Sequence, residues 1–376
     1  MSQPTIGVAV IGDGLMAKEH TMALRNVRPV FGEVPLDARL EVIVHPDPAR
    51  AEAAARQYGV EHWSTSWEEA VADPRVGLVD IVTPNVHHPA VAIAAAEAGK
   101  HIWCEKPLAS ALGDARRMAD AARRAGVVTM VGFTYLHNPA LALARELVER
   151  GELGELFSFT GFFSADTMID PEVPFTWRTD RSRAGGGAVA DLGSHLTSIA
   201  RMLAGDIARV AGLSRTVVAE RRDADGIPHA VDNDDHTLAL VEFASGMVGT
   251  MQASRVQTGR AFEVSFVLTG TRGAIRFSQQ DNYRLEVSLA SDGLDTHGFR
   301  TIEIGPGHGH FGALWPMSGI NVGLHELKIF EAHDLLRAIA GGPAARPDFA
   351  EALAVETTVD AIMRSAASGG AWTDVA

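Results

Sequence analysis

Two short segments of the sequence contain side chains that are suited to proton transfer. Lys106 follows Glu105 at the end of a short apolar run. Asp191 and His195 are four residues apart, a spacing that places them on one face of a helix. Imidazole exchanges protons near neutral pH, and an ammonium group stabilises a developing alkoxide. With His195 as the base, Lys106 as the positive charge and Asp191 as the orienting group, these residues suit the removal of a hydride from an alcohol.

A glycine-rich turn near the amino terminus predicts where the cofactor of such a reaction would bind. A G-x-G-x-x-A motif starting at Gly12 follows the β-branched apolar run Thr5–Ile11 and opens a helical stretch. Gly12 permits a tight turn, and Gly14 lets backbone N–H groups approach a pyrophosphate. The helix start at Leu15 and Met16 would stabilise the phosphate charge. We therefore expect a dinucleotide here; a glycine-rich turn without a ligand is the alternative.

The residue after the second strand normally distinguishes NAD from NADP, because an acid there bonds the ribose 2′-hydroxyl and repels a 2′-phosphate. In this sequence that residue is His45. Asp47 could still reach the ribose, whereas Arg50 could instead meet a phosphate. We expect NAD as the cofactor, with NADP as the alternative.

Strands and helices alternate over the first 133 residues, which is typical of a doubly wound parallel sheet. The expected strands are 5–11, 40–45, 78–83, 101–104 and 127–133. The expected helices are the stretch after the glycine turn up to 28, then 48–58, 66–72, 89–98 and 111–125. Ligands of such sheets bind at the carboxyl ends of the strands, which is where Glu105 and Lys106 stand.

The pattern changes after about residue 138, where alternating segments between turn signals predict a large, mostly antiparallel sheet. The expected strands are 156–163, 208–218, 236–243, 246–255, 261–269, 273–278 and 284–289, and the expected helices are 140–150, 189–204, 325–339 and 349–367. We predict an α/β protein with a dinucleotide-binding Rossmann domain over 1–133. A substrate-binding and oligomerisation α+β domain is expected over 134–376, with its last helices able to pack back on the first domain.

These motifs together resemble the Gfo/Idh/MocA family, that is, the glucose–fructose oxidoreductase and inositol dehydrogenase family. The resemblance rests on E-K-P at Glu105–Pro107 and on a G-G-G-x-x-x-D-x-x-x-H motif that ends at His195, and it covers nearly the whole chain. It implies that Lys106, Asp191 and His195 bind the substrate and move its proton. It also implies that Glu105 and Lys106 lie at the cofactor.

Further segments resemble parts of this family that contact the cofactor or the substrate. A T-P-N-x-x-H segment implies cofactor contacts from Thr83, Pro84, Asn85 and His88. A W-R segment like that of sugar and cyclitol dehydrogenases, with neighbouring polar residues, implies substrate contacts from Tyr135, Trp177, Arg178 and His308.

The resemblance implies a dehydrogenase that transfers a hydride from a secondary hydroxyl, at C3, of a sugar, anhydrosugar, glycoside or cyclitol. One alternative is an NAD-dependent, redox-neutral glycoside hydrolase, which oxidises, eliminates, hydrates and reduces its substrate again. Its substrate could be an anionic glycoside such as a sulfoquinovoside, held by Arg178, Arg181 and Arg183. Another is a non-catalytic binding or redox-sensing protein on the same fold. The family also implies a homo-oligomer, either a dimer or a homotetramer.

The composition argues against several other classes of protein. There are 33 Lys and Arg against 47 Asp and Glu, a net charge of −14, whereas nucleic-acid binding normally leaves a basic footprint. The single cysteine, Cys104, excludes an intramolecular disulfide and fits a reducing cytosol. No apolar run reaches the roughly 18 residues of a membrane span, and the amino terminus lacks a targeting signal. We expect a cytoplasmic protein with no nucleic-acid or membrane partner.

Two local clusters are interpreted as structural. His308 and His310 are taken as loop histidines near a sugar site, so we expect no metal. Asp232, Asp234 and Asp235 are expected to form a solvated acidic turn.

Overall fold

The computed structural model describes residues 4–293 and 295–376, which form two compact units. The first unit contains the chain up to Thr134 together with Gly323–Ala354, and the second contains Tyr135–Val322 and Val355–Ala376. A single boundary at 133/134 would assign helix α10 (Leu324–Ile339) to the second domain, but its contacts belong to the first unit. Helix α11 (Phe349–Ala367) begins in the first unit and continues into the second.

The first unit is built on a six-stranded parallel sheet with the order β3-β2-β1-β4-β5-β6. Its strands are β1 (Thr5–Ile11), β2 (Asp37–Val44), β3 (His62–Ser64), β4 (Val76–Ile81), β5 (His101–Cys104) and β6 (Thr129–Val131). Its helices before Thr134 are α1 (Leu15–Phe31), α2 (Pro48–Tyr58), α3 (Trp67–Ala72), α4 (His88–Glu97) and α5 (Leu112–Ala125). This strand order is that of the Rossmann fold, which confirms the fold class predicted for this part of the chain.

The central strands of this sheet are continuous apolar runs because both of their faces are buried. Val8 and Val10 of β1 and Leu78 and Val79 of β4 have no exposed surface. By contrast, β3 was not expected, because none of its three residues is buried and they form no apolar run.

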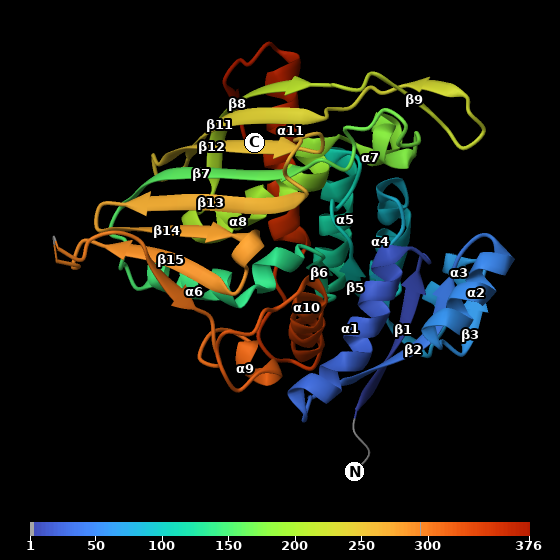
Figure 1. The fold of residues 1–376 in the computed structure, drawn as a ribbon. Coiled ribbons are helices and arrows are strands. Elements are labelled where there is room, and N and C mark those ends of the chain that lie inside the picture. The colour runs from blue at the N-terminus through green and yellow to red at the C-terminus, as the bar shows by residue number, and fades with distance from the viewer. Residues whose placement is uncertain (1–3, 294) are drawn as a thin grey trace. The chain divides into compact units, whose positions relative to one another are not determined.

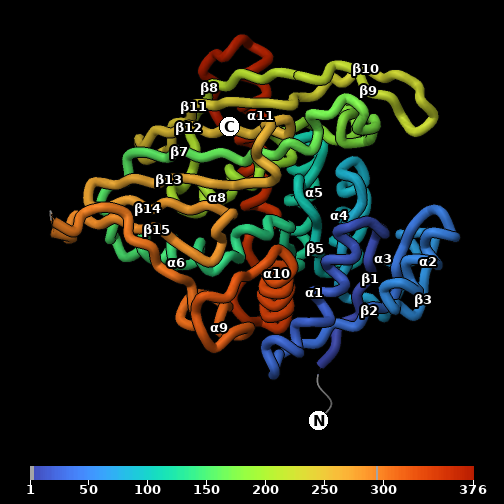
Figure 2. Tube along the Cα trace, in the orientation of Figure 1, coloured from blue at the N-terminus to red at the C-terminus, as the bar shows by residue number. Residues whose placement is uncertain are grey.

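Helix α10 packs beside α1 in the first unit (Figures 1 and 2). The ring of Phe31 stacks on His333 with 3.6 Å between centroids and meets the edge of Phe330 at 6.1 Å. Leu335 and Leu336 are buried in the same hydrophobic core as the strands of the sheet. The helix is therefore a core element of this unit, and the charged residues on its inner face are buried with it.

The second unit is built on a nine-stranded sheet with the order β16-β15-β14-β13-β7-β12-β11-β8-β17 (Figure 1). Its strands are β7 (Leu156–Ala165), β8 (Ile207–Arg215), β11 (His236–Phe243), β12 (Val248–Ser254), β13 (Phe262–Gly270), β14 (Gly273–Ser278), β15 (Arg284–Leu289), β16 (Arg300–Glu303) and β17 (Thr373–Asp374). A separate two-stranded sheet joins β9 (Glu220–Arg222) to β10 (Pro228–Ala230). Neighbouring strands of the large sheet are antiparallel apart from the parallel pair β7 and β12, which confirms the predicted mostly antiparallel sheet.

Helices α6 (Pro139–Glu149) and α8 (Ser194–Ala204) pack on strands of this sheet. The other helices of this unit before α11 are α7 (Arg181–Ala184) and α9 (Phe311–Leu314). A Cβ added to Gly161 of β7 would lie 2.8 Å from the side chain of Leu196, so α8 packs closely on the strand. The single helix expected over 189–204 in fact starts with a π-helical turn, η4 (Val189–Gly193), before α8. Such turns are frequent at functional sites.

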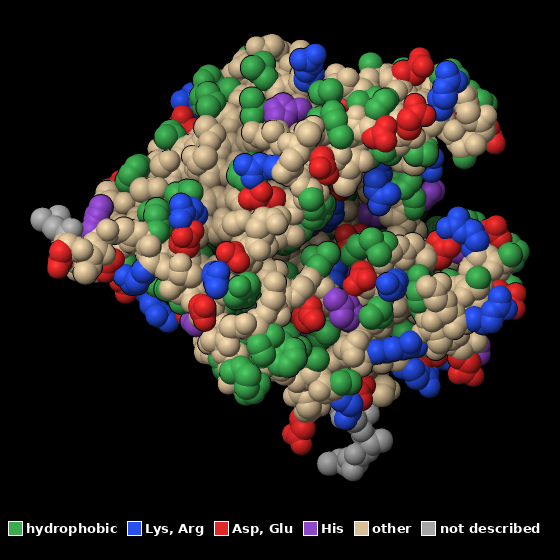
Figure 3. Space-filling view, viewed as in Figure 1, with side chains coloured by type: hydrophobic (Ala, Val, Ile, Leu, Met, Phe, Trp, Pro, Cys, Tyr) green, Lys and Arg blue, Asp and Glu red, His purple; other side chains and the backbone are tan. Residues whose placement is uncertain are grey.

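The surface drawn in Figure 3 carries acidic and basic side chains that are intermixed rather than separated by sign. This is the pattern of a solvated surface and not of a patch that binds a polyanion. Within the described residues, no helix combines the length and the apolar character that crossing a membrane requires.

Candidate active site

The first unit places its predicted cofactor residues after β1, β2, β4 and β5; we call this group the cofactor half-site. Gly12 has a φ of 125°, and a Cβ there would lie 2.8 Å from the carbonyl oxygen of Val82, so the turn requires glycine. Gly14 starts α1 without a side-chain cap, and a Cβ there would meet nothing within 4 Å. Leu15 is exposed and Met16 half-buried at this helix start. Backbone N–H groups with open space beside them fit the pyrophosphate of a dinucleotide.

The end of β2 is organised by polar contacts. Nδ1 of His45 accepts a hydrogen bond from the backbone N–H of Asp47 at 3.0 Å. The Asp47 carboxylate caps α2 by accepting from the N–H of Ala49 at 2.9 Å. Arg50 forms a bidentate ion pair with Asp13 of the glycine turn, with both N–O distances at 2.8 Å. The sequence alone had indicated no role for Asp13.

The segment after β4 contains the next group of predicted cofactor residues. Thr83 and Pro84 lead into a short 3-10 turn, η1 (Asn85–His87). The Thr83 hydroxyl is buried and has no hydrogen-bond partner in the described part of the chain, so it is available to a ligand. The buried ring of His88 has Nε2 2.9 Å from the Thr83 carbonyl oxygen and Nδ1 3.1 Å from that of Pro107. Burial lowers the pKa of His88, so the ring is neutral and its single N–H donates to only one of these two carbonyls at a time.

Glu105 is buried beneath the backbone of Lys106. Its Oε1 lies 2.7 Å from Nζ of Lys328 and 3.0 Å from Nε2 of His20. Its Oε2 accepts a hydrogen bond from the backbone N–H of Lys106 at 3.1 Å. A Cβ added to Gly132 would collide with the Glu105 carboxylate, so the neighbouring strand end must be glycine. Glu105 therefore fixes the backbone at Lys106, whose side chain is half-buried.

Glu105 belongs to a group that we call the buried ionic cluster, which consists of His20, Asp80, Glu105, Lys328 and Glu331. Nδ1 of His20 lies 2.7 Å from Asp80, and its ring stacks on Trp103 with 3.8 Å between centroids. Nζ of Lys328 lies 3.2 Å from Glu331, which also accepts a hydrogen bond from the indole N–H of Trp103 at 2.7 Å. The cluster thus joins α1, β4, the end of β5 and α10.

Burial disfavours the ionised form of the groups in this cluster. At three of them, neighbouring opposite charges and hydrogen bonds together shift the pKa the other way, toward the ionised form. Burial alone would raise the pKa of Glu105, yet Lys328 and His20 hold it well below its ordinary value. Burial alone would lower the pKa of Lys328, yet Glu105 and Glu331 raise it. Burial would also lower the pKa of His20, yet Asp80 and Glu105 together raise it. Asp80 differs, because burial raises its pKa and His20 only partly offsets the effect. Glu105 and Lys328 are therefore both ionised at neutral pH.

Sequence reasoning missed most of this cluster because its members stand in stretches with an apolar pattern. Asp80 lies in the buried strand β4, and His20 lies on the buried face of α1. Lys328 and Glu331 are one turn apart on a helix whose neighbouring residues are buried. That i, i+3 pair of opposite charges within an apolar face is the signal that could have indicated them.

The second unit brings together three predicted residues, Tyr135, Asp191 and His195, which we call the substrate half-site. Asp191 lies in the π-helical turn, and His195 follows in the first turn of α8. His195 is 6% exposed, and its ring centroid lies 5.0 Å from that of Tyr135 and 5.8 Å from that of Phe163. Burial raises the pKa of Tyr135 and the charge of Asp191 adds to the rise, so the phenol stays protonated. A base, a carboxylate and a hydroxyl donor therefore lie in one place.

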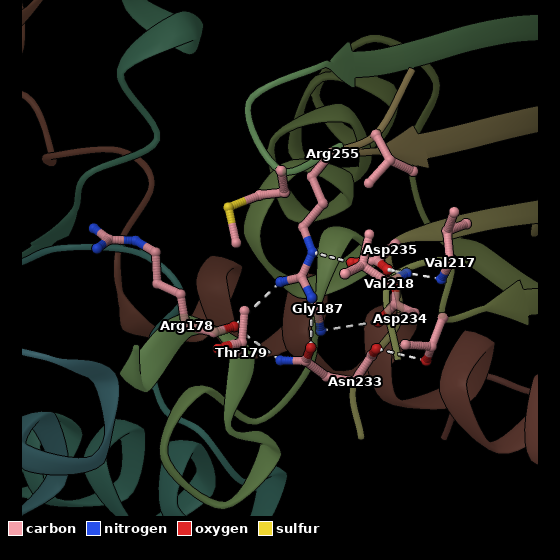
Figure 4. Close-up of polar contacts among 12 residues, drawn as sticks. Arg178, Thr179, Gly187, Val217, Val218, Asn233, Asp234, Asp235 and Arg255 are labelled. Atoms are coloured by element: carbon pink, nitrogen blue, oxygen red, sulfur yellow. Dashed lines mark hydrogen bonds and ion pairs between the residues drawn. The ribbon is translucent and has the colours of Figure 1, made fainter. Parts of the chain in front are cut away.

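The triglycine before this turn is held by Asp234 (Figure 4). One carboxylate oxygen of Asp234 accepts the N–H of Gly187 at 2.8 Å, and the other accepts that of Val189 at 2.9 Å. A Cβ added to Gly187 would collide with the backbone carbonyl of Asp234. Gly187 therefore allows the close approach of two backbone segments.

The expected solvated turn is confirmed for Asp232, which is exposed, but is wrong for Asp235, which belongs to a buried group of side chains (Asn233, Asp235 and Arg255) that we call the clamp. Asp235 is completely buried, and its carboxylate accepts from Nε of Arg255 at 2.7 Å (Figure 4). Arg255 also donates to the side-chain oxygen of Asn233 at 2.6 Å. Arg255 and Asn233 both donate to the backbone carbonyl of Arg178, at 3.2 and 2.8 Å. The positive charge of Arg255 is what allows Asp235 to be buried, and the clamp fixes the backbone of the predicted W-R segment.

The remaining predicted substrate residues lie in a short 3-10 helix, η3 (Trp177–Thr179), and in the turn that contains His308. The guanidinium of Arg178 stands 4.5 Å over the ring of Trp177, and the arginine is exposed. Nδ1 of His308 accepts a hydrogen bond from the N–H of Gly305 at 3.0 Å, so one of its ring nitrogens closes its own turn.

Comparisons with known proteins match both parts of the chain. Residues 6–133 match the oxidoreductase family with an NAD-binding Rossmann fold, and residues 141–276 match the GFO/IDH/MocA C-terminal domain. The chain is 39% identical over 383 residues to levoglucosan dehydrogenase of Pseudarthrobacter phenanthrenivorans, covering 98% of each protein. It is 31% identical over 268 residues to the NAD⁺-dependent scyllo-inositol 2-dehydrogenase of Bacillus subtilis, covering 71% of this chain and 72% of that one.

Solved structures agree with these matches. A levoglucosan dehydrogenase in complex with NADH and levoglucosan has a TM-score of 0.96 at 39% identity, covering 99% of each chain. An NAD binding oxidoreductase from Klebsiella pneumoniae has a TM-score of 0.95 at 35% identity, also covering 99% of each.

The Rossmann sheet, the glycine turn and the matched Rossmann-domain family define a dinucleotide-dependent oxidoreductase. The chain belongs to the Gfo/Idh/MocA family, as the resemblance implied. The predicted NAD cofactor is confirmed by the match to the NAD-binding domain and by neighbours solved with NADH.

The buried ionic cluster is tested by replacing its lysine. Lys328→Met leaves Glu105 and Glu331 buried without their cation, so we expect the free energy of unfolding to fall by about 3–5 kcal/mol. Urea denaturation followed by circular dichroism measures this change. The control is Lys18→Met, on the exposed side of α1, which should change the value by less than about 0.5 kcal/mol. Equal losses in the two variants would contradict the role of the cluster.

The triglycine is tested by adding one methyl group. Gly187→Ala pushes a Cβ into the carbonyl of Asp234, and overpacking of this kind costs about 1–3 kcal/mol. We expect a lower melting temperature by differential scanning calorimetry. Gly113→Ala, in α5 with nothing within 4 Å of the new atom, should instead stabilise by about 0.5–1 kcal/mol. A Gly187→Ala variant with the same melting temperature as the wild type would show that packing does not require the glycine.

Proposed function

We propose that the chain transfers a hydride to NAD from a secondary hydroxyl, that at C3, of a sugar, anhydrosugar, glycoside or cyclitol. The observation that carries this proposal is the grouping of His195, Asp191 and Tyr135 in a member of this family. A polyol substrate is supported by the relatives, which are named for levoglucosan and scyllo-inositol.

Each of His195, Asp191 and Lys106 has a separate role in the proposed hydride transfer. Bound NAD supplies the hydride acceptor. His195 takes the hydroxyl proton as the hydride leaves, and its burial against Phe163 keeps competing water away. Asp191 orients the imidazole or the substrate. Lys106, whose backbone is fixed by Glu105, stabilises the negative charge that develops on the substrate oxygen.

Other residues of the second unit recognise the sugar. The protonated Tyr135 hydroxyl donates a hydrogen bond to a substrate oxygen. Trp177 offers a ring face to the apolar side of a sugar, and Arg178 and His308 add polar contacts at its rim. The redox-neutral glycoside hydrolase begins with the same hydride step, so analysis of the product separates the two reactions.

The proposal is tested with purified protein, NAD and a panel of levoglucosan, scyllo-inositol and methyl glycosides. NADH absorbance and product NMR are followed in the same sample. We expect NADH to form in step with a keto-sugar. Free sugar released without net NADH would replace the proposal by the redox-neutral hydrolase, and the absence of both signals across the panel would contradict a sugar substrate.

The catalytic base is tested on the substrate that this panel identifies. His195→Asn should lower kcat by about 10²–10⁴-fold, because it removes the proton acceptor, while NADH still binds. The matched control is His87→Asn, which changes an exposed histidine and should leave kcat unchanged. Wild-type turnover by His195→Asn would exclude His195 as the base.

We further propose that the second unit forms a homodimer or homotetramer through the open face of its sheet. Leu238 and Leu240 of β11 are 46% and 52% exposed, with exposed Leu213 of β8 directly opposite Leu238. Monomers rarely expose contiguous apolar surface of this kind. Light scattering should give two or four times the 40.0 kDa chain mass, and Leu240→Glu should lower it. A wild-type chain that stays monomeric would contradict the proposal.

A further inference from the structure

The end of β2 lacks the acid that commonly distinguishes NAD from NADP, because His45 occupies that position. The structure brings another carboxylate to the same place. The backbone N–H of Gly12 donates to the carbonyl of Val44, the last residue of β2, at 2.9 Å. The next residue of the glycine turn, Asp13, therefore lies beside His45, with its Oδ1 3.8 Å from Nε2 of the imidazole.

Asp13 is held in one orientation. Nε and Nη2 of Arg50 contact its two carboxylate oxygens, each at 2.8 Å, which is the bidentate geometry that binds carboxylates most firmly. The hydroxyl of Tyr58 donates to the backbone carbonyl of Asp13 at 3.1 Å and fixes the turn from the other side. The Asp13 side chain is 15% exposed and that of Arg50 is 58% exposed. The carboxylate is thus oriented by the protein and still open to a ligand.

A carboxylate at this point has two effects on the cofactor. Its oxygens have about four acceptor sites, of which Arg50 uses two, so it can accept a hydrogen bond from the ribose 2′-hydroxyl. Its negative charge opposes a 2′-phosphate. Arg50 is the residue that would otherwise bind such a phosphate, and Asp13 engages its guanidinium.

The other acid near the end of β2 is Asp47, and its side chain caps a helix. Oδ1 of Asp47 accepts the backbone N–H groups of Ala49 and Arg50, at 2.9 and 3.3 Å, and so serves as the cap of α2. We propose that Asp13, oriented by Arg50, is the residue that selects NAD over NADP in this chain. The inference rests on the NAD-binding domain and not on the identity of the sugar.

The test measures dissociation constants of NADH and NADPH for the whole protein, from energy transfer between tryptophan and the reduced nicotinamide, with no sugar present. The wild type should bind NADH at least about tenfold more tightly than NADPH. Asp13→Asn should tighten NADPH binding by about 10- to 100-fold, since it removes the repulsion and frees Arg50 to make a charged hydrogen bond. The matched control is Asp47→Asn, which removes the same charge, keeps the helix cap and should leave the NADH/NADPH ratio unchanged.

A second variant keeps the test decisive if Asp13→Asn does not fold. Arg50→Ala leaves the Asp13 carboxylate in place without its counter-charge, so NADPH binding should weaken further while NADH binding is retained. The double variant Asp13→Asn/Arg50→Ala should lose the NADPH gain of the single change, because the guanidinium that binds the phosphate is gone.

Three results would overturn the inference: a wild type that binds both cofactors equally, an Asp47→Asn variant that shifts the ratio as much as Asp13→Asn, and a ratio that neither Asp13→Asn nor Arg50→Ala changes. A protein that binds NADH selectively but oxidises no sugar would refute only the proposed function, because this assay contains no sugar.

Discussion

The carboxylate of Glu105 is the contact on which the cofactor half-site depends. It meets His20 of α1 and Lys328 of α10 and accepts the backbone N–H of Lys106. Burying such charges costs several kcal/mol per ion, and the cost is offset here because each carboxylate has a cation or a donor beside it. Lys328 stands 223 residues after Glu105, so this contact makes a helix from late in the chain a core element of the first unit. A shift of that helix would leave Glu105 without its cation and would release the strand end that carries Lys106.

The second unit also uses carboxylates to fix the backbone, here near the predicted substrate residues. Asp235 is buried against Arg255, and Asp234 binds the N–H groups at the start of the π-helical turn. These contacts fix the backbone that leads to Asp191 and His195. In both units, carboxylates accept hydrogen bonds from backbone N–H groups, and the residues assigned to proton transfer lie on the elements that these bonds hold. Such support keeps reactive groups at a constant geometry, which hydride transfer requires.

Much of the fold was predictable because short stretches of the sequence, such as apolar runs and helix caps, determine it. The central strands β1 and β4 are continuous apolar runs, and α2 starts with a capping Asp47 and a proline and ends at a glycine in the left-handed region. Gly12 was identified from its place between a strand and a helix. The ionic cluster was not predictable, because Asp80 and Lys328 stand in apolar elements and acquire their roles only through partners far away in the sequence. The burial of Asp235 was missed for the same reason: nothing near Asp235 in the sequence indicates that Arg255 neutralises it.

Transfer of the hydride from C3 of a sugar to NAD is tested most directly by following deuterium. The protein would be given NAD and levoglucosan that carries deuterium only at C3, and the NADH and the sugar product would be analysed by NMR and mass spectrometry. We predict NADH with deuterium on C4 of the nicotinamide, and unlabelled NADH from levoglucosan deuterated only at C2 or C4. Unlabelled NADH from the C3-deuterated sugar, or a released sugar that keeps its deuterium without net NADH, would contradict the reaction assigned to Lys106, Asp191 and His195.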